Sequence, residues 1–155
     1  MKRKSYKDLK TWVTLRDYRP DDYTAIMDLW ADTGLGGAQR GDDQRIIEQS
    51  IAMGGKLLVA ESDDGELLGT SWMTFDGRRI HLHHLGVLPS YQRRGIGRLL
   101  SIASIDFARE KGIQIKLEVH RSNTAAIALY KNLGFKYLGD YDVYIIREFG
   151  GLIMR

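Results

Sequence analysis

The feature that most constrains the fold is a strand, a glycine-containing turn, a helix and a second strand that follow one another along the chain. The apolar run "IHLHHLGVL" leads into a turn that contains "QRRGIG". Apolar residues then recur at helical spacing from Ile96 to Phe107, and Gly112 is well suited to end that helix. The strand "IQIKLEV" comes next. A helix in this position is a crossover, and crossovers join parallel strands, so the sequence predicts one parallel pair.

The rest of the chain supplies the other elements of a mixed sheet. "WVTLR" alternates like a strand, and two helices follow, one after Pro20 and one from Asp42 or Asp43 to Met53. Short turns separate "KLLVAES", "ELLGTSWMTF" and "IHLHHLGVL", which predicts three antiparallel strands. A last helix, capped by Ser122, precedes two final strands. The expected order is βααβββαβαββ, an α/β (α+β) fold with a mostly antiparallel mixed sheet and helices on both faces.

The charge distribution divides the chain into a basic tail and a nearly neutral body. The net charge is +3, and residues 1–10 hold five lysines and arginines against one aspartate. A length of 155 residues fits one domain, and the sequence contains neither repeats nor an interdomain linker. We therefore expect residues 1–10 to form a flexible basic tail and residues 11–155 a single domain. A neutral body argues against nucleic-acid binding.

Several classes of protein are excluded by what the sequence lacks. The chain has no cysteine, so it has neither disulfides nor thiolate metal sites. No apolar run approaches the roughly 20 residues that span a bilayer, and no signal peptide is recognisable. We expect no membrane association and a cytoplasmic setting. His81 and His83 can ligate zinc, but no third ligand has a suitable spacing, so no metal is expected.

The turn "QRRGIG" has some features of a phosphate-binding loop but fits neither of the two best-known patterns. It lacks the third glycine of the dinucleotide fingerprint and the Lys-Ser/Thr pair of the P-loop. A turn between a strand and a helix still exposes unpaired backbone N–H groups to an anion, and Gly95 and Gly97 allow close approach. From these residues alone, anion binding and a plain turn remain equally good interpretations.

Two sequence blocks resemble the GCN5-related N-acetyltransferase (GNAT) family. "LGVLPSYQRRGIGRLL" is similar to its acetyl-CoA signature, whose core Gln/Arg-x-x-Gly-x-Gly/Ala is filled by Gln92, Gly95 and Gly97. "LEVHRSNTAAIALYKNLGF" is similar to a later motif of the family. The order of elements matches from Trp12 to Met154. The resemblance implies a GNAT fold in which the parallel strands splay apart, and acetyl-CoA as co-substrate.

The resemblance also implies which residues bind acetyl-CoA. Backbone amides of the turn would hold the pyrophosphate, and these belong to Arg93, Arg94, Gly95, Ile96, Gly97 and Arg98. Leu85, Gly86 and Val87 would pair with the pantetheine arm as a further strand does. The Val87 amide would bind the acetyl oxygen, and Asn123 would contact the cofactor arm.

Catalysis of acetyl transfer to an amine requires a base and an acid. By the resemblance, Tyr130 is the candidate acid that protonates the leaving thiolate. Glu118 is one candidate base, because "LEVHRSNTAAIALY" resembles the block of ribosomal-protein alanine acetyltransferases. The pair His81 and His83 is the other, because its strand resembles the His-x-His strand of arylalkylamine acetyltransferases. Alternate residues share a strand face, so His84 is expected to face the other way.

The expected activity is transfer of an acetyl group from acetyl-CoA to a primary amine by direct attack in a ternary complex. The alternative is a catalytically silent acyl-CoA sensor. The sequence does not identify the acceptor, which can be a small molecule or a protein amine. Aspartates of the acceptor region can attract a cationic amine, and aromatic residues there can pack on it. Because dimers are common for this fold, a homodimer is also expected.

Overall fold

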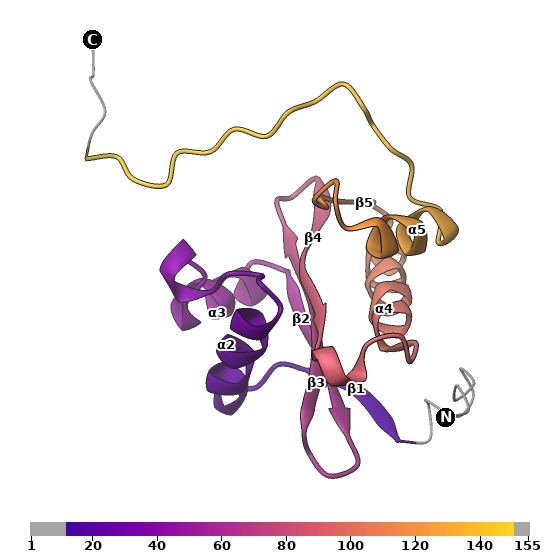
Figure 1. Cartoon of the computed structure of the whole chain (residues 1–155). Helices are drawn as coiled ribbons and strands as arrows, with labels where there is room; N and C mark the ends of the chain where they lie inside the picture. Colours follow the sequence, from indigo (N-terminus) through magenta and orange to yellow (C-terminus); the bar gives the residue numbers. More distant parts are fainter. Residues whose placement is uncertain (1–11, 151–155) are drawn as a thin grey trace.

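The computed structural model describes residues 12–150, so the expected basic tail of residues 1–10 lies outside the described residues. Figure 1 shows a central sheet with helices on both faces. Its five strands lie in the order of the sequence. They are β1 (Val13–Asp17), β2 (Lys56–Ser62), β3 (Leu67–Phe75), β4 (Arg79–Val87) and β5 (Gln114–Leu117). Neighbouring strands are antiparallel except β4 and β5, which are parallel as the crossover predicted.

The helices begin and end where the sequence supplies the groups that satisfy their ends. They are α2 (Tyr23–Asp32), α3 (Gln44–Ala52), α4 (Ile96–Lys111) and α5 (Thr124–Asn132). Three short 3-10 turns precede α2, α3 and α4: η1 (Pro20–Asp22), η2 (Ala38–Arg40) and η3 (Pro89–Tyr91). The Asp43 carboxylate accepts a hydrogen bond from the Ile46 amide at 2.9 Å and so caps α3. Gly112 ends α4 in the left-handed conformation, with φ 69°.

One face of the sheet packs against α4, and the other packs against α2 and α3. On one face, Ile96 and Leu100 of α4 are buried against strand residues such as Met73 and Ile80. On the other face, Ile26 and Trp30 of α2 belong to a second buried cluster. In Figure 1, α2 and α3 lie to the left of the sheet and α4 lies to the right. Burial on both faces fixes the register of β3 and β4, because a one-residue slip would exchange the two sets of side chains.

Two local expectations near α5 were wrong. Asn123, not Ser122, caps the helix, because its side-chain oxygen accepts a hydrogen bond from the Ala126 amide at 3.3 Å. The Ser122 hydroxyl instead bonds to His120 Nδ1 at 2.7 Å. Strand β5 also ends at Leu117 rather than at residue 119, so Glu118 lies just beyond the sheet.

The two expected final strands are not formed. Within residues 12–150 the last element is α5, and the segment of residues 137–149 contains no strand. We call this segment the C-terminal arm; Figure 1 shows it running past the ends of β4 and β5 and away from the domain. Its apolar side chains are exposed, by as much as 92% at Tyr144. A segment with an alternating pattern forms a strand only where a neighbouring strand supplies its hydrogen-bond partners. The edge strand nearest in sequence, β5, is only four residues long.

Among the described residues, no helix is long and apolar enough to cross a membrane.

Candidate active site

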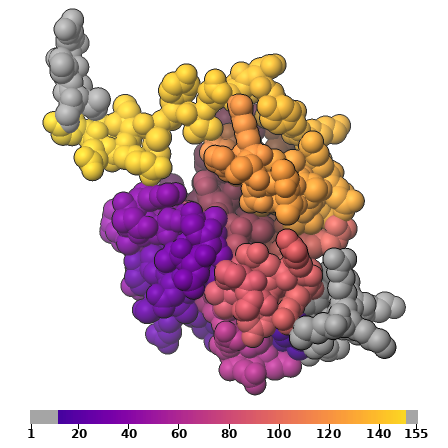
Figure 2. Space-filling view, in the orientation of Figure 1, coloured from indigo at the N-terminus to yellow at the C-terminus, as the bar shows by residue number. Residues whose placement is uncertain are grey.

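A cleft opens where the two parallel strands separate. Pairing between β4 and β5 begins at Arg79 and Gln114 and ends at Leu82 and Leu117. Beyond that point β4 continues to Val87 without β5 beside it. Figure 2 shows a recess here, surrounded by the purple surface of α2 and α3, the salmon start of α4 and orange α5. Separation of the strands leaves this edge of β4 accessible to a ligand.

The cleft is lined by residues from five parts of the chain. They are Thr33, Leu35, Leu85, Gly86, Val87, Tyr91, Gln92, Arg93, Gly97, Asn123 and Ala126. Six of the ten residues expected to bind the cofactor are therefore brought together, from Leu85 to Asn123. The pattern of the acetyl-CoA signature found Gln92 but assigned it no contact. Thr33, Leu35 and Tyr91 had no signal beyond their place in the chain.

The four other expected cofactor residues do not line the cleft with their side chains. Ile96 is buried in the core, at 1% exposure. Arg98 donates a hydrogen bond from Nη1 to Asn132 Oδ1 at 2.7 Å, and Arg94 lies over the Tyr91 ring at 5.2 Å. Gly95 is the N-cap of α4, with φ 92°. For these residues the expected contact is through the backbone amide, which a side-chain position does not contradict.

The turn before α4 has an unusual backbone conformation. Arg93 and Gly95 both have left-handed φ angles, 62° and 92°. The Gln92 side chain donates to the Val87 carbonyl at 3.0 Å and so ties the turn to the end of β4. The first amides of a 16-residue helix have no partner within the helix, and the helix dipole favours an anion beside them. The arrangement suits a phosphate group.

Two glycines line the cleft, and their surroundings differ. A Cβ at Gly86 would come within 2.6 Å of the Leu35 side chain, so glycine there permits close packing of the loop between α2 and α3. A Cβ at Gly97 would meet only Val87, at an ordinary 3.9 Å. The protein itself therefore has room for a larger residue at position 97. Absence of a side chain at this lining position fits a ligand that approaches the backbone closely.

The candidate bases form one cluster on β4 and the segment after β5. The rings of His81 and His83 stack with centroids 4.0 Å apart, as residues on one strand face should. His83 Nε2 lies 2.9 Å from the Thr74 hydroxyl. His81 Nε2 lies 3.8 Å from Glu118 Oε1. The structure thus brings together two groups that the sequence offered as alternatives.

Burial sets the protonation of this cluster. It lowers the pKa of His81, and the nearby Glu118 carboxylate partly opposes that effect. Burial, together with repulsion from His81, lowers the pKa of His83 to about 4. Both imidazoles are therefore neutral near pH 7 and able to accept a proton.

Tyr130 is buried at 9% exposure, with its ring packed edge-on against Phe135 at 5.6 Å. Ala126, one turn earlier on the same face of α5, lines the cleft. Burial raises the pKa of the Tyr130 phenol, which therefore stays protonated and able to donate. This position is compatible with the acid role that the family motif implies.

The expectation for His84 was wrong. The register between β3 and β4 shifts between Thr70 and Trp72, so two residues of β4 lie opposite one of β3. His84 has φ 42°, and its ring lies beside Trp72, on the same face as His83. A bulge breaks the period-two rule on which the expectation depended.

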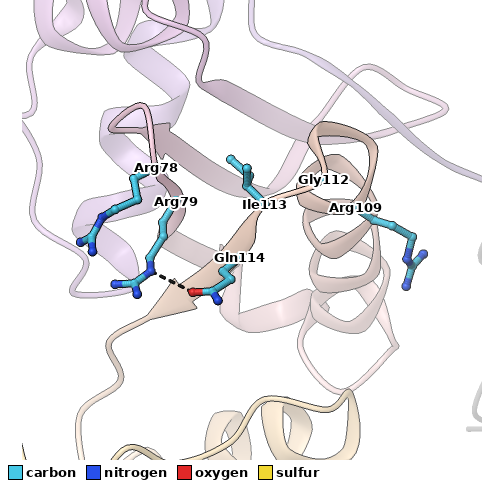
Figure 3. A pocket seen from close by; sticks show the side chains of 6 residues that line it. All are labelled: Arg78, Arg79, Arg109, Gly112, Ile113 and Gln114. Atoms are coloured by element: carbon cyan, nitrogen blue, oxygen red, sulfur yellow. Dashed lines mark hydrogen bonds between the residues drawn. The ribbon is translucent and has the colours of Figure 1, made fainter.

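A second hollow, about 610 Å³, lies at the other end of β4. It is lined by Arg78, Arg79, Arg109, Gly112, Ile113 and Gln114. Figure 3 shows Arg79 bonded to Gln114 and the Arg109 side chain pointing away from Arg78 and Arg79. The charged groups diverge, so this hollow does not form a site for one ligand. Residues 12–150 also contain no group of three or more His, Asp or Glu side chains arranged as metal ligands.

Comparison with protein families decides what kind of domain this cleft belongs to. The model of the acetyltransferase (GNAT) family matches residues 23–135, which include the splayed strands, the glycine turn and α5. The chain belongs to the GNAT family. The fold expected from the two sequence blocks is thereby confirmed, with its parallel pair.

Individual GNAT relatives are similar over part of the chain. The N-alpha-acetyltransferase RimI of Mycobacterium tuberculosis is 41% identical over 85 residues, 52% of each protein. The mycothiol acetyltransferase of Clavibacter sepedonicus is 37% identical over 99 residues, 63% of this chain and 32% of that protein. The chain thus spans between about a third and about a half of these two curated relatives.

Among solved GNAT-like structures, the Salmonella typhimurium protein yncA was determined with its cofactor acetyl-CoA. It is 27% identical to this chain, with a TM-score of 0.67 and 79% of each chain covered.

Proposed function

We propose that this protein is an acetyl-CoA-dependent N-acetyltransferase that acetylates a primary amine by direct attack in a ternary complex. The observation that carries the proposal is the position of the cleft. It opens on β4 beyond the end of the β4–β5 pairing and is lined by the glycine turn, while His81 and His83 lie a few residues earlier on β4 and Glu118 lies beside His81, outside the lining itself. One end suits a pyrophosphate and the other suits proton transfer. Residues 11–155 would act as one domain.

Binding would use backbone groups more than side chains. Leu85, Gly86 and Val87 lie on the strand edge that β5 leaves, where an amide-containing arm can pair as another strand does. The amides from Arg93 to Arg98 would receive the pyrophosphate. Asn123 uses its side-chain oxygen to cap α5, so its amide N–H groups are left to face a ligand. The Val87 amide would donate to the acetyl oxygen.

The proton transfers would be divided between two sides of the cleft. An alkylamine with a pKa of about 10.4 is almost wholly protonated at pH 7 and must lose a proton before it attacks. His81, His83 and Glu118 would take that proton as one network, directly or through water. Tyr130 would then donate its phenolic proton to the thiolate of the leaving coenzyme. As the intermediate collapses, the attacking nitrogen loses its second proton to solvent. The network then releases its proton to solvent and the tyrosinate regains one, so that one proton is released for each acetyl group transferred.

The alternative, a silent sensor of acyl-CoA, requires only the cleft and the glycine turn. It gives no reason for a neutral histidine pair to stack beside a carboxylate at the cleft. Neither does it explain a buried, protonated tyrosine on the helix that closes the cleft. These features favour an enzyme.

The acceptor is proposed as a primary amine, of a small molecule or of a peptide. The loop between α2 and α3, which contributes Thr33 and Leu35 to the cleft, would form one wall of its site. Relatives with different printed names share this domain, one an N-alpha-acetyltransferase and one a mycothiol acetyltransferase. The domain is therefore compatible with peptide and small-molecule amines alike.

We also propose that two copies associate through the C-terminal arm. Eight large apolar side chains of this arm are more than half exposed: Tyr137, Leu138, Tyr141, Val143, Tyr144, Ile145, Ile146 and Phe149. Large apolar side chains exposed this close together in sequence are uncommon on a monomer. The free edge of β5 on a second copy has unpaired backbone N–H and C=O groups, with which the arm would pair.

The decisive experiment measures free CoA released from acetyl-CoA in the presence of a panel of acceptors. The panel includes alkylamines, arylalkylamines, an aminoglycoside, amino acids and peptides with free N-termini. An enzyme gives CoA release with one class together with a mass increase of one acetyl group on that acceptor. Tight binding of acetyl-CoA by calorimetry, with no turnover on any acceptor, would instead support the sensor.

A further inference from the structure

A second titratable pair lies beside the catalytic cluster and has no part in the proton transfers above. His84 Nε2 lies 2.8 Å from Asp42 Oδ2, and the two side chains are only 14% and 26% exposed. His84 belongs to the bulge of β4, and Asp42 to the loop between α2 and α3. The contact therefore joins the strand that borders the cleft to a loop that forms its wall.

The strand side of this contact is held rigidly. The Thr70 hydroxyl donates to the His84 carbonyl at 2.9 Å, and Trp30 Nε1 donates to the same hydroxyl oxygen at 2.9 Å. The His84 ring stacks on Trp30 and Trp72, with centroids 4.3 and 5.4 Å apart. A left-handed φ is uncommon for a residue with a side chain and persists only where its surroundings enforce it. These contacts fix where the imidazole points.

On the loop side, backbone hydrogen bonds run to α2, as from the Leu35 amide to the Trp30 carbonyl, or stay within the loop. Gly34, Gly36, Gly37 and Gly41 all have positive φ angles, so much of the loop's path depends on residues that confer little stiffness. Asp42 anchors its end, with its amide bonded to the Gly37 carbonyl at 3.1 Å. The carboxylate of Asp42 is the side-chain group that links this anchor to β4.

The anchored loop carries two residues of the cleft. The Thr33 and Leu35 side chains lie against Gly86, where an added Cβ would come within 3.3 Å and 2.6 Å of them. The loop thus contacts β4 at two places, at Gly86 through packing and at His84 through a hydrogen bond. Loss of the second contact would leave this loop joined to β4 only through the packing at Gly86.

We propose that His84 and Asp42 are positioning residues that hold the α2–α3 loop against β4 and so shape the acceptor wall of the cleft. The inference rests on the proposed function, because it assigns the loop to the acceptor of that reaction. The glycine turn and α4 lie on the other side of the cleft, so the hold on the coenzyme should not depend on this pair.

The test combines a measurement on the free protein with a kinetic one. Asp42→Ala removes the carboxylate and leaves the bulge intact, while His84→Phe keeps a flat ring for the tryptophans and removes Nε2. Hydrogen exchange without substrate should become faster in residues 33–43, including the Leu35 amide bonded to the Trp30 carbonyl at 2.9 Å. Exchange in α4 should stay the same. Asp28→Ala, an exposed change on α2, is the matched control.

In the kinetic arm the acceptor KM should rise about tenfold in either variant, as expected for loss of a charge-assisted hydrogen bond. The dissociation constant of acetyl-CoA should change less than about twofold. The double variant should be no worse than either single one, because both act through one contact. Asp42→Asn, whose amide oxygen still accepts a hydrogen bond, should recover part of the loss.

Unchanged exchange in residues 33–43 of folded Asp42→Ala would overturn the inference, even if the enzyme is active. An equal rise in acceptor KM and in the acetyl-CoA dissociation constant would also overturn it, since that indicates general distortion. If the wild-type protein transfers no acetyl group, the proposed function fails, and the exchange data still decide whether the pair holds the loop.

Discussion

His81 Nε2 and Glu118 Oε1 lie 3.8 Å apart across the point where β4 and β5 separate. One water molecule, or a small side-chain rotation, is enough to connect them by hydrogen bonds. The His81 ring is itself stacked on His83. An incoming amine at this edge would therefore meet a single proton-accepting network formed by β4 and the segment after β5.

The first prediction is that Glu118→Gln and the double variant His81→Gln, His83→Gln each lower kcat. A lost general base typically costs 10²–10⁴-fold, and we expect the lower end, about 10², because Glu118 is half exposed to solvent. The triple variant should be little slower than either. Losses that multiply would show that carboxylate and imidazoles act independently.

The second prediction concerns pH and stability. The pKa of His83 is about 4 in the folded protein against 6.5 as a free side chain. Between these values the unfolded chain binds a proton that the folded chain does not. The unfolding free energy must therefore fall as pH decreases from 6.5 towards 4, by at most about 1.4 kcal/mol per pH unit.

Urea unfolding at several pH values measures this effect. His83→Gln should flatten the slope between pH 4 and 6.5, whereas a change at exposed His120 should leave it as in the wild type. A slope that is the same in both variants would mean that His83 is not held neutral by the fold.

The third prediction separates the coenzyme site from the fold. Gly97→Leu places a side chain where a Cβ meets only Val87, at an ordinary 3.9 Å. Leucine in a helix is favoured over glycine, so the melting temperature should change little. Calorimetry should nevertheless show acetyl-CoA binding weaker by about tenfold or more, because the side chain occupies the ligand's place. Gly97→Ala is the matched control, because the family signature accepts alanine at this position, and it should bind acetyl-CoA as the wild type does.

The fourth prediction is that Tyr130→Phe binds acetyl-CoA normally and turns over about 10²-fold more slowly. Because burial raises the pKa of this phenol, the wild-type donor stays protonated from pH 6 to 9, and the deficit should be constant over that range. Tyr137→Phe changes a tyrosine that is 80% exposed and serves as the control. Normal turnover by Tyr130→Phe would leave the tyrosine with a packing role only.

The fifth prediction tests association through the C-terminal arm. Light scattering during gel filtration should give a mass of about twice the 17.7 kDa of one chain. Removal of residues 137–155 should reduce it to one chain without loss of the β-sheet signal in circular dichroism. A wild-type protein of one-chain mass at high concentration would contradict the proposal.

Much of the fold was predictable because its determinants are local. The crossover, the start of α3 at Asp43 and the end of α4 at Gly112 follow from periodicity and capping residues. The alternation of β4 is interrupted at His83 and His84, and this was the one local signal of the bulge. The direction of the His84 side chain was not predictable from it, because Thr70 and Trp30 from distant elements hold the extra residue in place.

Site prediction succeeded where a motif is continuous in sequence. The lining residues found in this way are Leu85, Gly86, Val87, Arg93 and Gly97. Thr33, Leu35 and Asp42 come from a loop about 50 residues away, and only the pairing of strands brings them near. The missing final strands show the same limit. The alternating pattern of the C-terminal arm does not identify the sheet edge with which the arm would pair.

Strand β5 stops pairing with β4 after four residues, and this short ladder has a thermodynamic consequence. The exposed edge of β4 consists of main-chain donors and acceptors, so a ligand that pairs with them extends the cooperative unit of the sheet. Occupancy then adds directly to the unfolding free energy, by about 2.7 kcal/mol at a ligand concentration one hundred times its dissociation constant. The melting temperature of this protein should consequently report the concentration of its acyl donor.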